Sequence, residues 1–135
     1  MTRKFLLGVS LIELMVVMGV IGIILLIGAP LYQDYIAAAR TSVLNDNIQT
    51  IRVMQDERRR DLGEYVEGDY VPEGTTTLTT RLGWTPRTDS DDVTYQVVCV
   101  TAGANAGECA RTSGYTVTAT HSEAPSDPVS RTFNP

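Results

Sequence analysis

The sequence predicts an α+β protein, in which a long N-terminal helix packs its second half on a small antiparallel β-sheet head. Three observations support this fold class. An apolar stretch runs from Val9 to Leu31, with Glu13 as its only charged residue. Apolar residues then recur at helical spacing, and three later segments are rich in β-branched and aromatic residues. At 135 residues the chain has room for one modest core.

The apolar stretch is long enough to cross a membrane. From Val9 to Leu31 it has 23 residues, which as a helix would extend about 35 Å, against a hydrocarbon layer of about 30 Å. The preceding residues 1–8 are basic and end at Gly8. Their positive charge predicts that this end stays in the cytoplasm. An ordinary secretory signal is cut after its apolar core, whereas here the candidate cut precedes the core, which would therefore stay with the protein.

Glu13 is the unusual residue of this stretch, because a charge inside a bilayer costs several kcal/mol and normally has a partner. Cleavage after Gly8 would create a new amino group on Val9, four residues before Glu13 and on the same helical face. The carboxylate can pair with this amine or with that of a neighbouring helix in slight stagger. The second alternative would make Glu13 an assembly residue.

Two runs carry a resemblance to a known family: Gly8-Val9-Ser10-Leu11-Ile12-Glu13-Leu14, and, beyond Gly22, Pro30-Leu31-Tyr32-Gln33-Asp34-Tyr35-Ile36. They resemble the leader and stalk of type IV pilins, most closely the type IVa pilins with their minor subunits. The similarity covers roughly residues 4–36. Most members of the family have Phe where this chain has Val9.

The resemblance implies a sequence of events. A prepilin peptidase would cleave between Gly8 and Val9 and methylate the new amine of Val9. Glu13 would then pair with that amine on an adjacent subunit. The chain would sit in the inner membrane as a single-pass protein with its head outside the cytoplasm, and afterwards in a pilus at the cell surface. Its expected partners are further copies, other pilins and the inner-membrane assembly machinery.

Three residues in the apolar stretch disfavour a regular helix. Gly22 and Gly28 are weak helix formers, and Pro30 removes a helical hydrogen bond. The resemblance implies that this stretch loses helical order within the filament. Alternatively, the glycines permit close helix packing, and both readings can hold together.

An amphipathic helix is expected over residues 36–62. Its apolar stripe is Leu44, Ile48, Ile51 and Met54, at spacings of four, three and three. Gly63 is expected to end the helix. Polar residues lie between the stripe positions, among them Asn45, Asp46, Asn47, Arg52 and Asp56. The charge run Asp56–Asp61 is interpreted as a solvated face with internal ion pairs, in preference to a DNA or phosphate contact by its three arginines.

The remaining head divides into a loop region, residues 63–92, and a sheet region, residues 93–135. Within the loop region Leu78 to Trp84 is a candidate short element, and Tyr65, Tyr70 and Trp84 are expected to cover the core. Strands are predicted at Val93–Val100, at Tyr115–His121 and, more weakly, at Val129–Phe133, as an antiparallel meander. The domain boundaries are therefore a leader 1–8, an apolar helix half 9–35 and a head 36–135.

The two cysteines, Cys99 and Cys109, are close in sequence. In an exported head such a pair is typical of a disulfide. The intervening residues 100–108 are small, and we expect them to be flexible and exposed. A disulfide here would stabilise the head by about 2–4 kcal/mol.

Several function classes are disfavoured by composition. Without residues 1–8 the chain has 9 Arg and 16 Asp+Glu, so its acidic head should repel DNA. No catalytic set is visible around His121, the only histidine; no cofactor or metal site is predicted. The acidic group Asp89, Asp91 and Asp92 lacks the spacing typical of a calcium loop, although calcium binding there stays open.

The leading hypothesis is therefore a non-enzymatic structural subunit of a type IV pilus, major or minor. One alternative is a pseudopilin of a type II secretion system, which shares the leader and stalk. Another is a DNA-receptor minor pilin, which the acidic head disfavours.

Overall fold

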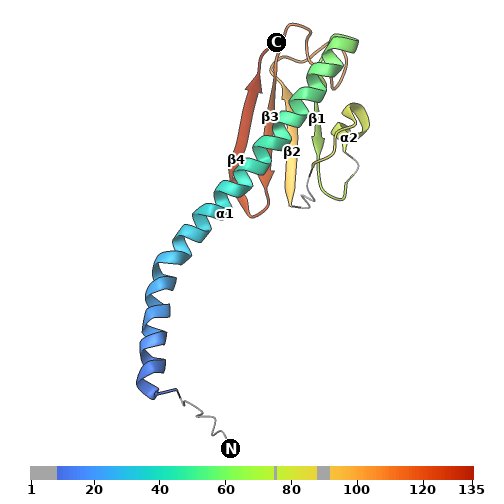
Figure 1. Ribbon diagram of the computed structural model, residues 1–135. Coiled ribbons are helices and arrows are strands. Elements are labelled where there is room, and N and C mark those ends of the chain that lie inside the picture. Colours follow the sequence, from blue (N-terminus) through green and yellow to red (C-terminus); the bar gives the residue numbers. More distant parts are fainter. Residues whose placement is uncertain (1–8, 75, 88–91) are drawn as a thin grey trace, which may run out of the picture. The chain divides into compact units, whose positions relative to one another are not determined.

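The computed structural model describes residues 9–74, 76–87 and 92–135 (Figure 1). The chain forms two compact units, Met1–Arg40 and Thr41–Pro135, and one helix contributes to both. The elements in chain order are α1 Leu11–Leu62, β1 Gly68–Tyr70, α2 Thr77–Leu82, β2 Val93–Cys99, β3 Tyr115–His121 and β4 Ala124–Phe133. This is the predicted α+β arrangement, with a long helix and an antiparallel sheet.

The sheet has the strand order β1-β2-β3-β4, and every neighbouring pair is antiparallel. The predicted meander is thus confirmed for β2, β3 and β4, with β4 beginning at Ala124, five residues before the predicted start. Region 63–92 is less loop-like than expected. It contains α2, close to the predicted short element, and strand β1, whose Tyr70 lies opposite Tyr95.

Helix α1 ends where the sequence predicts. Gly63 follows the last helical residue, Leu62, and has a φ of 84°. Its N–H donates to the carbonyl of Arg59 at 2.8 Å. A residue with a side chain would be strained at this backbone angle, so glycine is the residue that allows the helix to end here.

The core lies between the second half of α1 and one face of the sheet. Leu44, Ile48 and Ile51 are buried, and Met54 is partly buried against the same cluster. The sheet supplies the alternate residues of its strands, among them Val97 and Val117. As predicted, aromatic residues cover this core; the ones from region 63–92 are Tyr65, Tyr70 and Trp84.

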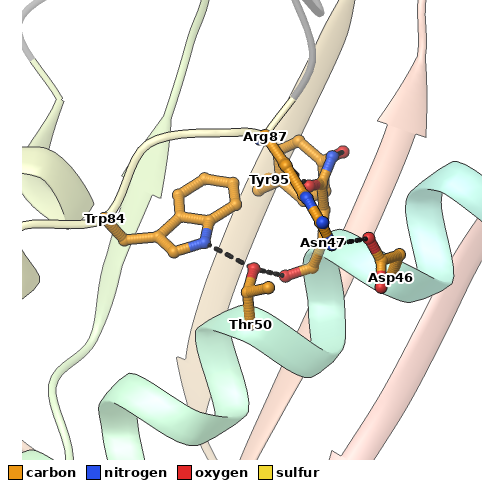
Figure 2. A network of polar contacts seen from close by, with 6 residues as sticks. All are labelled: Asp46, Asn47, Thr50, Trp84, Arg87 and Tyr95. Carbon is orange, nitrogen blue, oxygen red and sulfur yellow. Dashed lines mark hydrogen bonds and ion pairs between the residues drawn. The ribbon is translucent and has the colours of Figure 1, made fainter.

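Two polar residues of α1 are buried, and the apolar stripe did not predict either of them. Asn47, predicted to lie between the stripe positions, is 1% exposed. Its amide donates to the hydroxyl of Tyr95 at 2.8 Å and accepts from the backbone N–H of Arg87 at 3.2 Å. Figure 2 shows this network, which Thr50 extends by accepting from the Trp84 indole at 2.9 Å.

Gln55 is the second buried polar residue, with no exposed surface. Its side-chain amide donates to the carbonyl of Val66 at 2.6 Å and accepts from the N–H of Val66 at 2.9 Å. One side chain thus satisfies both backbone groups of a buried residue. Because an unpaired buried amide would be costly, Gln55 fixes the segment after α1 against the helix.

Candidate functional site

The first part of α1 forms an apolar segment, defined here as residues 11–31. Four consecutive residues, Leu14, Met15, Val16 and Val17, are 49–66% exposed. Successive helical residues are about 100° apart, so these four cover the whole circumference. A helix that is apolar on every side is typical of burial in a membrane or in a bundle of helices. Among the described residues, α1 is the one helix long and apolar enough to cross a membrane, with a mean hydropathy of 2.7.

Glu13 is the only charged residue of this segment and lies in the first turn of α1. The N–H groups of Glu13 and Leu14 donate to the carbonyl of Ser10, at 3.0 and 3.2 Å. A carboxylate in the first turn interacts favourably with the helix dipole. Across the described chain, no hydrogen bond or ion pair involves the Glu13 carboxylate. It is therefore available to a group from another chain.

The predicted cleavage and methylation site lies at the border of the described residues. Val9 is 73% exposed and precedes the first residue of α1 by two positions. Gly8 lies outside the described residues. The expected proximity of a Val9 amine to Glu13 therefore stays a prediction.

The three residues expected to disturb the helix lie inside α1, which is continuous from Leu11 to Leu62 in the single chain. A methyl group added at Gly22 or Gly28 would meet nothing within 4 Å. Packing within this chain therefore does not explain either glycine. Loss of helical order around Pro30 was predicted only for the filament, and it stays a prediction.

The predicted disulfide between Cys99 and Cys109 is present, with a Cα–Cα distance of 5.2 Å. Two backbone hydrogen bonds involve the segment between the cysteines. The N–H of Gly103 donates to the carbonyl of Glu108 at 2.7 Å, and the N–H of Glu67 donates to the carbonyl of Gly107 at 2.9 Å. The second bond fastens the disulfide loop to the segment that follows α1. Most of residues 100–108 are exposed, as predicted, and their flexibility stays a prediction.

The arginines of the charge run contact the head rather than only solvent. Arg58 donates to the carbonyl of Arg81 at 3.0 Å, and Arg59 donates to the hydroxyl of Tyr65 at 2.7 Å. An ion pair within the run's own helix joins Arg52 to Asp56 at 3.8 Å. Arg52 lies outside the run, and no ion pair between two residues of the run is found in the described part of the chain.

Of the residues weighed for catalysis and metal binding, His121 and Asp92 are described, and both lie near the turn between β3 and β4. His121 accepts a hydrogen bond at Nδ1 from the N–H of Glu123, at 3.1 Å. Asp92 is exposed, while Asp89 and Asp91 lie outside the described residues. Within the part of the chain that the structure describes, no group of three or more metal-ligating side chains is found. The calcium question for this loop stays open.

Comparisons with protein-family models, with characterised proteins and with solved structures found no match to this chain.

Proposed function

We propose that this chain is a structural subunit of a type IV pilus. Its apolar segment would hold it in the inner membrane, with the head outside the cytoplasm, until assembly. A prepilin peptidase would remove residues 1–8 and expose the amine of Val9. The subunit would then join further copies and other pilins through the apolar segment, with a structural rather than an enzymatic role.

One observation carries the proposal: an apolar helix exposed on all sides, with a single carboxylate, Glu13, in its first turn. Burying each large aliphatic side chain is worth about 1.5–3 kcal/mol, so the segment strongly favours lipid or a core of packed helices. In either place the Glu13 carboxylate needs a positive partner. The amine of a neighbouring subunit supplies that charge, so correct assembly is the step that neutralises both groups.

The disulfide supports the proposed location of the head. Disulfides persist in oxidising compartments outside the cytoplasm and are rare within it. Both cysteines lie in unit Thr41–Pro135 and none of them is free. A head on the outer side of the inner membrane is consistent with this chemistry.

The test of the assembly role is Glu13→Leu in the full chain. We expect the variant to insert in the membrane as well as the wild type but to be depleted in sheared filaments, because its pairing charge is lost. The matched control is Glu57→Leu, which removes an exposed carboxylate from the head part of the same helix. Equal amounts of the Glu13 variant and the control in filaments would contradict the proposal.

A second measurement tests the processing. Mass spectrometry of the assembled protein should give a chain that begins at a methylated Val9. Retention of residues 1–8 in the assembled form would exclude the proposed pathway. Immunogold labelling then identifies the assembly: decorated surface fibres indicate a pilus, and label confined to the envelope, with a secretion defect on deletion, indicates a pseudopilus.

A further inference from the structure

A pocket of about 420 Å³ lies in the head beside the C-terminal part of α1. It is lined by the side chains of Arg52, Arg59 and Arg60, together with Asp56 and Tyr65. We call it the arginine pocket. All of these residues belong to unit Thr41–Pro135.

Two of the three guanidinium groups are held on aromatic rings. The guanidinium of Arg59 lies 4.9 Å from the ring centroid of Tyr65. The guanidinium of Arg52 lies 5.1 Å from the ring centroid of Phe133. Stacking restrains these long side chains before any ligand arrives. Arg59 donates from Nη1 to the Tyr65 hydroxyl and Arg52 pairs with Asp56 through Nε, so their other N–H groups are the ones left for a carboxylate.

The charge of the arginine pocket is opposite to that of the unit that contains it. Residues 41–135 contain 8 arginines and 14 acidic residues, a net charge of −6. The pocket, in contrast, has three arginines against the Asp56 side chain and the terminal carboxylate of Pro135, which also lines it, so its net charge is +1. A neighbouring pocket at the same helix end is balanced, because Glu57 and Asp61 accompany Arg58 and Arg81. The arginine pocket therefore has a positive excess that this neighbouring pocket lacks.

The opposite end of the sheet is acidic. Arg52 contacts Phe133, where β4 ends, and Phe133 lies opposite Tyr115, where β3 begins. At the other end of these strands, around the turn between β3 and β4, lie the exposed residues Asp92, Glu123 and Asp127, which we call the acidic end. Figure 1 shows the C-terminus and this turn at opposite ends of the sheet. A strand of β3's seven residues separates two such ends by about 20 Å.

We propose that the arginine pocket of one head binds the acidic end of a second copy of this chain in the assembled filament. This inference rests on the proposed function and adds the surfaces through which heads meet. Contact between two different patches of the same chain is heterologous, and it continues from copy to copy without closing if the rotation does not form a ring. Pairing of two like patches would bring charges of the same sign together, which complementary ends avoid.

Photo-crosslinking in living cells tests which surfaces meet. Asn134 lines the arginine pocket, is exposed and carries no charge, so a photoreactive amino acid at this position keeps all three arginines. The same amino acid at Val17 in the apolar segment reports helix packing as a positive control. We expect the pocket probe to capture a second copy at the peptide that contains Glu123 and Asp127. Capture of another region, capture of a different protein, or no capture while the Val17 probe succeeds would overturn the proposal.

Charge reversal tests the energetic role of the contact. Arg60 is exposed, and Arg60→Glu should reduce the filament yield in physiological salt by about threefold or more, since each lost charge contact weakens a repeated interface. Adding Glu123→Arg in the same chain reverses one charge on each side and should restore part of the yield. The control Arg111→Glu reverses an exposed charge outside the pocket, and it should change the yield by less than about twofold. Equal loss for both arginine variants, or no rescue, would overturn the pairing.

The two proposals fail in different ways. Wild-type cells without filaments that contain this chain would contradict the proposed function. If the Arg60→Glu variant forms filaments in normal yield while the Glu13→Leu variant is depleted from filaments, the proposed function stands. Only the proposed contact between heads is then contradicted.

Discussion

Tyr95 and Tyr115 are both buried in the core of the head, but their hydroxyl groups differ. The hydroxyl of Tyr95 accepts a hydrogen bond from Asn47 at 2.8 Å. The hydroxyl of Tyr115 is buried and has no hydrogen-bond partner among the described residues. Burial is the main cause that raises the pKa of each tyrosine above its usual value. The nearby negative charge of Asp56 raises the pKa of Tyr115 further.

This difference predicts that the same substitution, tyrosine to phenylalanine, changes the free energy of unfolding differently at the two positions. Tyr115→Phe removes a buried hydroxyl without a partner, so the free energy of unfolding should stay the same or rise by up to about 1 kcal/mol. The matched change Tyr95→Phe leaves the side-chain N–H group of Asn47 without its acceptor and should lower the free energy of unfolding by about 1–3 kcal/mol. Urea unfolding of the full chain in detergent micelles, followed by near-ultraviolet circular dichroism, measures both values. A larger loss for Tyr115→Phe than for Tyr95→Phe would contradict this account.

The same two tyrosines predict alkaline sensitivity. Their pKa values are higher in the folded head than the usual value near 10, so the unfolded chain loses these protons at lower pH. The stabilising contribution is complete below about pH 10 and is lost as the pH rises from there through the folded pKa values. Unfolding measured at a series of pH values should show this decline. It should be smaller in Tyr115→Phe, and an identical decline in that variant would argue against the role of Tyr115.

At the scale of elements, α1 joins two different environments, and its apolar stripe is what fixes the head. Ile48 has no exposed surface, whereas Val53, five residues later, is 65% exposed. Ile48→Ala should destabilise the head by about 2–5 kcal/mol, because it removes buried methyl groups and leaves a cavity. Val53→Ala should cost less than about 0.5 kcal/mol. The same denaturation experiment gives both numbers, and a comparable loss for the two variants would refute the assignment of the stripe.

The disulfide links the end of β2 to a loop that is itself bonded to the segment after α1. Replacing both cysteines by serine should lower the free energy of unfolding by about 2–4 kcal/mol, because the unfolded chain regains its freedom. Amide hydrogen exchange should increase first in residues 100–108, and the apolar segment should be unaffected. Unchanged exchange in this loop would contradict the prediction. It would mean that the hydrogen bonds to Tyr65–Glu67 keep the loop in place without the disulfide.

The elements that depend on local pattern were predictable, and those that depend on distant partners were not. Helix α1 ended at Leu62 as expected, and β3 has the predicted bounds, because caps and alternation are local signals. Strand β1 has only three residues, Gly68-Asp69-Tyr70, and exists because β2 supplies its hydrogen bonds. The burial of Asn47 and Gln55 could not be predicted from apolar periodicity either. Each depends on a hydrogen-bond partner elsewhere in the chain, 48 and 11 residues away.

At the scale of the whole molecule, the two candidate interaction sites differ in how visible they are in the sequence. Glu13 stands out because it interrupts an apolar run, and no tertiary structure is needed to notice it. The arginine pocket requires the fold, because Arg52 and Phe133 meet only when β4 returns to α1. The arginine run was visible in the sequence, but its surplus of positive charge was hidden by the acids that flank it.

The packing of α1 in the head has a mechanical consequence for the filament that we propose, if that filament is placed under tension. Within the head, a pull along α1 acts parallel to the row formed by Leu44, Ile48 and Ile51 on that helix. The load then acts as shear on that row, so its contacts and the Asn47 and Gln55 hydrogen bonds must yield together rather than one after another. Optical-trap stretching of single filaments should therefore find the head giving way abruptly, at a force that falls when Ile48 is truncated.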